Sequence, residues 1–282
     1  MAYCRTTTLA PARSSCPEPC DYQGIALFWP RAELHYTFNA SLFPGLSEAQ
    51  VRSIFEKSFG KWQSIQCWTS DANGGAYQTP IGFQITADEQ TTDERDGHVA
   101  SRDPAANKNV IFHLSREEWA ADPELPRRAF AVTSVWFNDA TGEILGADMQ
   151  FNGTLDPFGI CPADTGCTAT DGDPTNDGTV DLQNVATHEA GHFLGLAHSA
   201  DEDSTMSCDA SPGDVNKRTL GQDDIDGMCD AYPPGESFKG PTKQGSGSSG
   251  ASCALSETGG ESNASAALSA LALLALFRRR RR

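Results

Sequence analysis

Apolar and polar residues follow two rhythms along this chain, one typical of helices and one typical of strands. Ser47 and Gln50 are spaced as in a capping box, and apolar residues then recur at intervals of three and four. This spacing predicts a first helix whose buried face consists of Val51, Ile54, Phe55, Phe59 and Trp62. Runs rich in β-branched and aromatic residues predict strands at 81–86, 110–114, 131–137 and 144–151, with a turn at 139–142. The mixture favours an α+β fold.

The C-terminal part has a different pattern. Residues 239–263 are rich in Gly and Ser, which is typical of a flexible linker. Fourteen mostly apolar residues at 264–277 follow, and five arginines end the chain. The apolar run is shorter than the roughly 20 residues that span a bilayer comfortably. We therefore expect an N-terminal cysteine-containing segment at 1–23, a main domain at 24–235, a linker at 236–263, and an apolar segment with an arginine cluster at 264–282.

Length and charge narrow the function classes. The chain has 282 residues, enough for one domain with a full hydrophobic core, which we expect to be a monomer. Its formal net charge is −17. We therefore do not expect the protein to bind nucleic acid, since a protein that neutralises phosphates needs a basic face.

Nine cysteines indicate an oxidising compartment. Cys253 stands apart in the linker. No apolar secretory signal follows Met1. We therefore expect the natural protein to start upstream of Met1 with a signal peptide. The other eight cysteines can form up to four disulfides, whose pairing the sequence leaves open: Cys4, Cys16, Cys20, Cys67, Cys161, Cys167, Cys208 and Cys229.

The most informative motif begins at His188. Residues four apart lie on one face of a helix, so His188 and His192 can present ring nitrogens to one metal ion. Zinc binds imidazole nitrogens at about 2.0–2.1 Å. Glu189 follows the first histidine, where its carboxylate can reach a metal-bound water without binding the metal itself.

Gly195 and His198 complete the motif. Because glycine lacks a Cβ, Gly195 can take φ > 0, end the helix and let His198 return to the metal. Three protein ligands leave one zinc position open, which distinguishes a catalytic site from a structural one. A surface helix with solvated histidines is the alternative, and it does not require these fixed offsets. We predict one catalytic zinc ion bound by His188, His192 and His198, with Glu189 as general base for hydrolysis of a peptide bond.

This motif resembles the extended zinc-binding motif of the metzincins, a family of zinc proteases. Residues 204–207 resemble the metzincin Met-turn, which places Met206 beneath the metal. Further similarity to the matrixin branch lies in Ser199 and in residues 146–151, 180–187 and 220–228. The resemblance implies a twisted mixed sheet, an active-site helix, and a C-terminal helix after the Met-turn. It also implies a zinc-dependent endopeptidase that acts on proteins or peptides, with an edge strand at 131–137 that pairs with the substrate.

The chain departs from the matrixin pattern in two places. The histidine spacing by which typical matrixins bind a structural zinc is missing, so we expect His35, His98 and His113 to be surface or packed residues. A propeptide cysteine switch is also missing. Cys16 and Cys20 imitate one, but disulfide bonding is the better interpretation.

An acidic run before the active-site motif suggests calcium. Asp171, Asp173, Asp177 and Asp181 partly follow the register of an EF-hand loop. The bidentate Glu at the twelfth position is missing, because Asn184 stands there. The alternative is a solvated turn in which Asp181 caps the active-site helix.

The tail and the cysteines together predict a secreted or surface-attached protein. A Cys, an apolar segment and an arginine cluster resemble the C-terminal sorting tags of bacterial surface proteins, in particular the myxobacterial type. A simple tail anchor that associates with the membrane is the alternative. For the domain itself, the alternative function is a non-catalytic surface protein that binds peptide or matrix on a metzincin scaffold.

Overall fold

The computed structural model describes residues 3–9, 23–40, 43–71, 73–95, 107–155, 157–163, 166–167, 178–235, 238 and 278–280. Several features singled out in the sequence lie outside the described residues. They are Cys16 and Cys20, His98, the acidic run with Asp171, Asp173 and Asp177, and the linker and apolar segment at 239–277 with Cys253.

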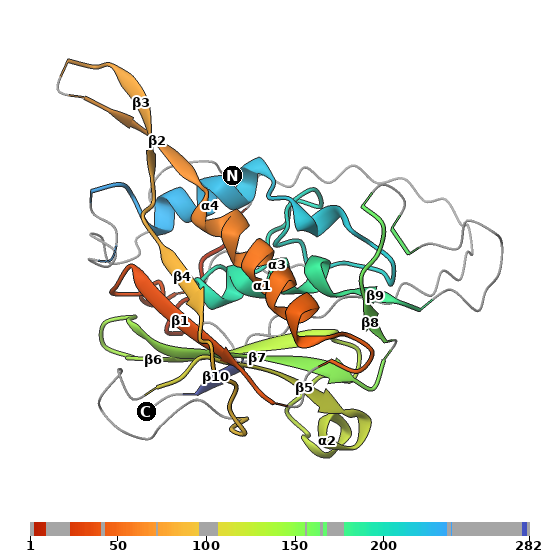
Figure 1. Ribbon diagram of the computed structural model, residues 1–282. Helices are drawn as coiled ribbons and strands as arrows, with labels where there is room; N and C mark the ends of the chain where they lie inside the picture. Colours follow the sequence, from red (N-terminus) through yellow and green to blue (C-terminus); the bar gives the residue numbers. More distant parts are fainter. Residues whose placement is uncertain are drawn as a thin grey trace, which may run out of the picture.

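One layer of the molecule is a mixed sheet, and Figure 1 shows the long helices packed against it. The strand order is β10-β6-β7-β5-β1-β4. Pairs β1–β4, β1–β5, β5–β7 and β10–β6 are parallel, whereas β6 and β7 are antiparallel. The mixed sheet confirms the predicted fold class. The strands are β1 (Glu33–Phe38), β4 (Gln84–Ala87), β5 (Val110–Ser115), β6 (Ala131–Phe137), β7 (Ile144–Gly153) and β10 (Arg278–Arg280).

Helices α1 (Glu48–Gln63), α3 (Leu182–Phe193) and α4 (Gln222–Ala231) lie on one side of the sheet (Figure 1). The main hydrophobic core fills the space between these helices and the sheet. Helix α2 (Arg116–Ala121) follows β5 and buries Trp119 in a second, smaller core with Val110, Phe112 and Leu114. The two cores follow from the alternation of side chains along β5, whose Ile111 belongs to the main core.

Helix α1 begins and packs as its sequence predicts. Ser47 is the N-cap, and the reciprocal hydrogen bonds with Gln50 form the capping box. All five predicted apolar positions are buried. Trp62 fixes the helix to the neighbouring one, because its indole Nε1 donates to the Thr187 carbonyl of α3 at 2.9 Å.

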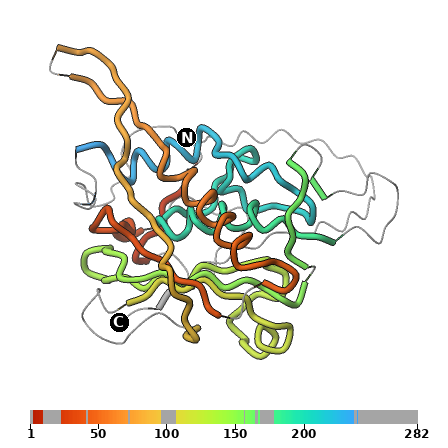
Figure 2. Tube along the Cα trace, viewed as in Figure 1, coloured from red at the N-terminus to blue at the C-terminus, as the bar shows by residue number. Residues whose placement is uncertain are grey.

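Several elements were not predicted from the sequence, including strand β1 and the ribbon described next. Strands β2 (Gln66–Ser70) and β3 (Ala76–Pro80) form an antiparallel ribbon that projects away from the body (Figures 1 and 2). A disulfide between Cys67 and Cys229 ties the base of this ribbon to α4. Helix α2 was also missed.

The strand predicted at 81–86 begins only at Gln84. Gly82 takes φ +90°, which an extended strand cannot include. Three short elements complete the structure around α3. They are the paired strands β8 (Phe158–Gly159) and β9 (Val180–Asp181), and the 3₁₀ helix η3 (Asn216–Arg218).

Candidate active site

The active-site helix α3 starts at Asp181, whose carboxylate is fully buried. Oδ1 accepts the Asn184 N–H at 2.7 Å and the Arg218 Nε–H at 2.8 Å, while Oδ2 accepts the Cys161 N–H and a second Arg218 N–H. A carboxylate has about four lone-pair positions, and here protein donors use all of them. Asp181 therefore serves as the helix cap, and it has no free position for calcium. Asp171, Asp173 and Asp177, which were predicted to share that site, are not among the described residues.

The end of α3 turns sharply at Gly195, as predicted. Gly195 has φ +93°, and a Cβ at this position would lie 2.9 Å from the Leu27 carbonyl oxygen. The last helical carbonyls are bonded by side chains from distant segments. Trp29 Nε1 donates to the Phe193 carbonyl at 2.8 Å, and the Tyr232 hydroxyl donates to the Leu194 carbonyl at 2.7 Å. These bonds satisfy the orphan acceptors of the helix end and fix the bend.

The N-terminal segment holds the chain just after the bend. The Thr6 N–H donates to the Gly195 carbonyl at 3.1 Å, and the Ala197 N–H donates to the Cys4 carbonyl at 2.9 Å. These antiparallel contacts immediately precede His198. The N-terminal segment was not expected to take part in the site, because nothing in its sequence links it to residues almost 200 positions away.

His188, His192 and His198 come together and are buried. Their ligand atoms lie within 4.8 Å of one another, and they form the group in the described part of the chain that could hold a metal ion. The Nε2 atoms of His192 and His198 are 3.2 Å apart. Three nitrogens bound tetrahedrally to one zinc ion would be about 3.4 Å apart, from a Zn–N distance of about 2.05 Å.

Backbone carbonyls orient two of the rings. His188 Nδ1 lies 2.6 Å from the Thr205 carbonyl oxygen, and His192 Nδ1 lies 2.9 Å from that of Leu196. Each Nδ1–H donates to its carbonyl, which leaves the lone pair of Nε2 for a metal. His188 Nε2 is buried and has no hydrogen-bond partner. A buried nitrogen without a partner is costly unless a ligand supplies one, so this donor set fits zinc.

The electrostatics of the site keep the imidazoles neutral. Burial lowers the pKa of all three histidines, that of His192 to about 4, and the nearby ammonium of Lys217 contributes. Neutral imidazole is the form that binds a metal. Lys217 itself is buried, and its Nζ donates to the Ser207 carbonyl. Burial lowers the pKa of Lys217 to about 8.

Glu189 follows His188 on α3, and its side chain is completely buried. Its Oε2 accepts the Thr133 hydroxyl of β6 at 2.5 Å, whereas Oε1 has no hydrogen-bond partner. Burial raises the pKa of Glu189 to about 8, although the Thr133 hydrogen bond and the charge of Lys217 act in the opposite direction. The sequence did not reveal Thr133, because a lone threonine in a strand carries no signal of its partner.

The Met206 side chain packs against Gly191 of α3, the residue before His192. A Cβ on Gly191 would lie 2.2 Å from the Met206 sulfur, so this close contact requires glycine at position 191. The turn at 204–207 that contains Met206 is held by Asp224 of α4. Asp224 accepts hydrogen bonds from Ser204 Oγ and from the N–H groups of Thr205, Met206 and Gly221.

A second carboxylate of α4, that of Asp223, binds the residue after His198 and the N-terminal segment. Asp223 accepts a hydrogen bond from Ser199 Oγ at 2.6 Å and another from the Tyr3 N–H at 2.9 Å. The sequence resemblance marked this stretch as a helix but did not assign a role to either aspartate.

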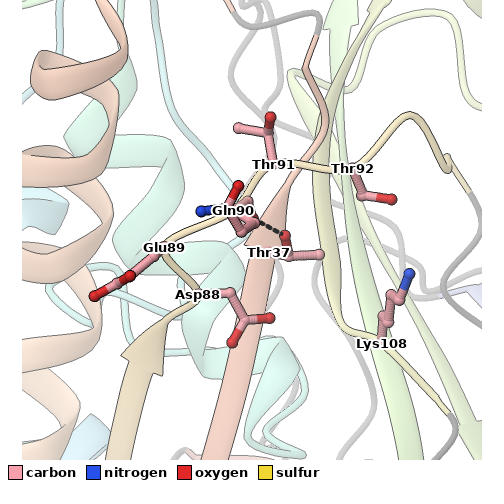
Figure 3. Close-up of a pocket in the computed structure, with 7 residues that line it drawn as sticks. All are labelled: Thr37, Asp88, Glu89, Gln90, Thr91, Thr92 and Lys108. Atoms are coloured by element: carbon pink, nitrogen blue, oxygen red, sulfur yellow. Dashed lines mark hydrogen bonds between the residues drawn. The ribbon is translucent and has the colours of Figure 1, made fainter.

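The other described histidines stand outside the group. His35 is exposed, and His113 lies against aromatic rings that include Phe43. A separate polar pocket lies beside β1, where the Thr37 hydroxyl donates to the Gln90 carbonyl at 2.9 Å (Figure 3). Its lining contains none of the predicted site residues. The lining consists of Thr37, Asp88, Glu89, Gln90, Thr91, Thr92 and Lys108.

Comparison with known proteins gives one family. A sequence model of the matrixin family matches residues 28–233. The chain is 27% identical over 221 residues to metalloendoproteinase 2-MMP of Arabidopsis thaliana, which covers 76% of this chain and 45% of that protein. It is 43% identical over 208 residues to metalloendoproteinase 5-MMP of the same plant, covering 72% and 45% respectively. Human matrix metalloproteinase-16 is 38% identical over 216 residues, covering 76% of this chain and 29% of that protein.

The chain spans less than half the length of these relatives. The match to the family nevertheless extends from before β1 to the end of α4, and it includes the three histidines, Glu189 and Met206. The chain therefore belongs to the matrixin family.

Proposed function

We propose that this protein is a zinc-dependent endopeptidase that hydrolyses peptide bonds in proteins. The observation that carries this proposal is the pairing of two features in one buried site. Three imidazoles gather their ligand nitrogens within 4.8 Å, and the Glu189 carboxylate beside them has one oxygen without a partner. The proposal agrees with the names of the relatives, which are metalloendoproteinases.

His188, His192 and His198 are the residues that would hold zinc. Once bound, zinc supplies Lewis-acid chemistry, which polarises a peptide carbonyl and makes water a stronger nucleophile near neutral pH. The protein's own contribution is to fix the three rings by backbone hydrogen bonds and to bury them away from competing water.

Glu189 is the proposed general base. Its free Oε1 takes the proton from the attacking water and then passes it to the leaving amine. In this account the carboxylate does not bind the metal: Thr133 holds Oε2, and Oε1 accepts the proton of the water. No covalent intermediate with the protein is required.

Strand β6 is the proposed docking edge for an extended substrate. Thr133 of β6 contacts Glu189, so the strand adjoins the candidate site. Main-chain pairing with a sheet edge gives affinity with little sequence preference. In this structure β10 pairs with Ser134–Trp136 along that edge, so a substrate that pairs there must replace β10.

We further propose that residues 24–235 form the catalytic domain and that the protein acts as a monomer outside the cell or on its surface. Two disulfides, Cys67–Cys229 and Cys161–Cys167, fit such an oxidising location, and Cys4 and Cys208 are also disulfide-bonded. None of the helices in the described part of the chain has the length and apolar character that a membrane crossing requires. A bacterial sorting tag at the C-terminus remains part of this proposal, as does a calcium site formed by Asp171, Asp173 and Asp177 without Asp181.

The test is digestion of a denatured protein and of a quenched fluorescent peptide library, with cleavage sites mapped by mass spectrometry. We expect the zinc-loaded chain to cut internal bonds, a chelator to stop cleavage, and added zinc to restore it. A folded, zinc-loaded chain that cleaves nothing would favour the non-catalytic binding protein instead. Cleavage that persists after zinc removal would contradict the metal-dependent mechanism.

A further inference from the structure

The Glu189 carboxylate is held at one oxygen. Glu189 Oε2 accepts the Thr133 hydroxyl at 2.5 Å, and both residues are completely buried. Thr133 Oγ1 also lies 3.3 Å from the Glu189 backbone carbonyl. A hydroxyl has one hydrogen to donate, and a charged acceptor at the shorter distance is the stronger partner. The hydrogen bond therefore joins the side chain of β6 to the side chain of α3.

The position of the Thr133 hydroxyl is well fixed. Thr133 pairs with Met149 in the antiparallel ladder between β6 and β7, and this pairing fixes its backbone. Threonine is β-branched and has few χ1 rotamers. The neighbouring Ser134 points to the opposite face, where its hydroxyl accepts a hydrogen bond from Gln150 Nε2 at 2.9 Å. Only the threonine side chain faces Glu189 in this pair.

The other carboxylate oxygen is left open. Oε1 of Glu189 is buried without a hydrogen-bond partner, as is Nε2 of His188. A glutamate side chain has three rotatable bonds, so an unrestrained carboxylate would exchange its two oxygens and change its distance to the reacting water. One hydrogen bond at Oε2 prevents this exchange and leaves Oε1 as the oxygen that receives the proton.

We propose that Thr133 is a positioning residue that orients the general base through Oε2 of Glu189. This inference rests on the proposed peptidase function and deepens it. Thr133 acts through Glu189 and is not itself a catalytic residue. Its removal should therefore slow the chemical step without weakening substrate or zinc binding.

The test compares three variants of the full chain on one quenched fluorescent peptide. Thr133→Val keeps the side-chain shape and removes the hydroxyl, and Thr133→Ser keeps the hydroxyl. Thr37→Val is the matched control, because it removes a buried threonine hydroxyl on β1 that donates to the Gln90 carbonyl and does not touch Glu189. The measurements are kcat, KM, bound zinc per chain and Tm.

We expect Thr133→Val to lower kcat by about 10- to 100-fold, the usual effect of misplacing a reacting group, with KM changed by less than about 2-fold. Bound zinc should stay at the wild-type level. Thr133→Ser should recover most of kcat, and Thr37→Val should keep it within about 2-fold of wild type. A kcat for Thr133→Val equal to that of wild type, or an equal loss in the serine variant, would overturn the proposal.

A stability measurement separates this proposal from the peptidase function. Thr133→Val should lower Tm more in the wild-type background than in a Glu189→Ala background, because the hydrogen bond to the Glu189 carboxylate exists only in the first. Equal shifts in both backgrounds would overturn the positioning role. A zinc-loaded wild type that cleaves no peptide, together with coupled Tm shifts, would refute the peptidase function while the contact between Thr133 and Glu189 stands.

Discussion

Burial sets the protonation state of each residue in the candidate site. Three neutral imidazoles and one carboxyl group are buried from solvent on α3 and the turn that follows it. Burial lowers the pKa of His192 to about 4 and raises that of Glu189 to about 8. Without metal, both groups therefore favour their uncharged forms near pH 6, and the site is ready to accept a cation with little rearrangement.

These shifts predict how the metal-free chain depends on pH. A histidine with a lowered pKa costs stability as pH falls below 6.5, because the unfolded chain binds the proton first, at about 1.4 kcal/mol per pH unit for each group. Glu189 has the opposite effect between its ordinary pKa of 4.5 and its pKa of about 8 in the folded chain, since the folded form holds the extra proton in that range. Below pH 6.5 the loss of stability from the three histidines is larger than the gain from Glu189. Between pH 6.5 and about pH 8 the effect of Glu189 on stability dominates.

We therefore expect Tm of the metal-free chain to be highest near pH 6.5 and lower at both pH 4.5 and pH 8. Thermal unfolding in the presence of a chelator measures this. The variant Glu189→Gln should lose the decline between pH 6.5 and pH 8. A wild-type Tm that rises steadily up to pH 8 would show that Glu189 is ionised in the metal-free site.

Single residues were predictable where one local segment contains them. His188, His192 and His198 lie within eleven positions, and helix periodicity with a glycine turn is enough to bring them together. Thr133 was not predictable, because it meets Glu189 only through the packing of β6 on α3, 56 positions apart.

At the scale of elements, α4 holds the Met-turn and thereby the ring of His188. Asp224 accepts four protein donors, and the turn that it holds includes Thr205, whose carbonyl orients His188. We expect Asp224→Ala to destabilise the fold by more than about 3 kcal/mol, since several buried donors lose a charged acceptor. Zinc affinity should fall as well.

Thermal unfolding and zinc titration check this prediction. Asp226→Ala is the control, because Asp226 lies on the same helix and bonds only an exposed side chain, that of Gln222. Equal effects of the two substitutions would show that α4 acts through its general stability and not through the turn.

Elements were predictable where their patterns are strong. The capping box and apolar spacing of α1, and the strands near 110–114, 131–137 and 144–151, match the structure closely. Helix α2 was missed although Ser115 and Glu118 form a capping box, because the helix has only 6 residues. The β2–β3 ribbon was missed because most of its side chains are exposed and show no clear alternation, with Trp68 71% exposed.

Across the whole molecule, segments far apart in sequence meet around the candidate active site. The N-terminal segment lies against the bend after α3, and β10, from the C-terminal arginine run, lies along β6. Neither contact could be predicted, because pairing between distant backbone segments leaves no local pattern.

The place of β10 leads to a prediction about the tail. Because β10 pairs with the edge of β6 at which we propose that substrates dock, removing residues 236–282 should lower KM for extended peptides. Short dipeptide-like substrates that do not reach β6 should be unaffected. Steady-state kinetics on both substrate types, with the full chain as reference, measures the difference. An unchanged KM for extended peptides would show that β10 does not compete with substrate.

The central claim is that three histidines bind zinc and Glu189 performs the proton transfer. The most direct measurement determines peptide hydrolysis and bound zinc together for wild type, Glu189→Gln and His192→Ala. We predict that Glu189→Gln retains one zinc per chain and the fold but loses at least about 100-fold in kcat. His192→Ala should lose both zinc and activity. A Glu189→Gln variant that cleaves peptides at the wild-type rate would contradict the account.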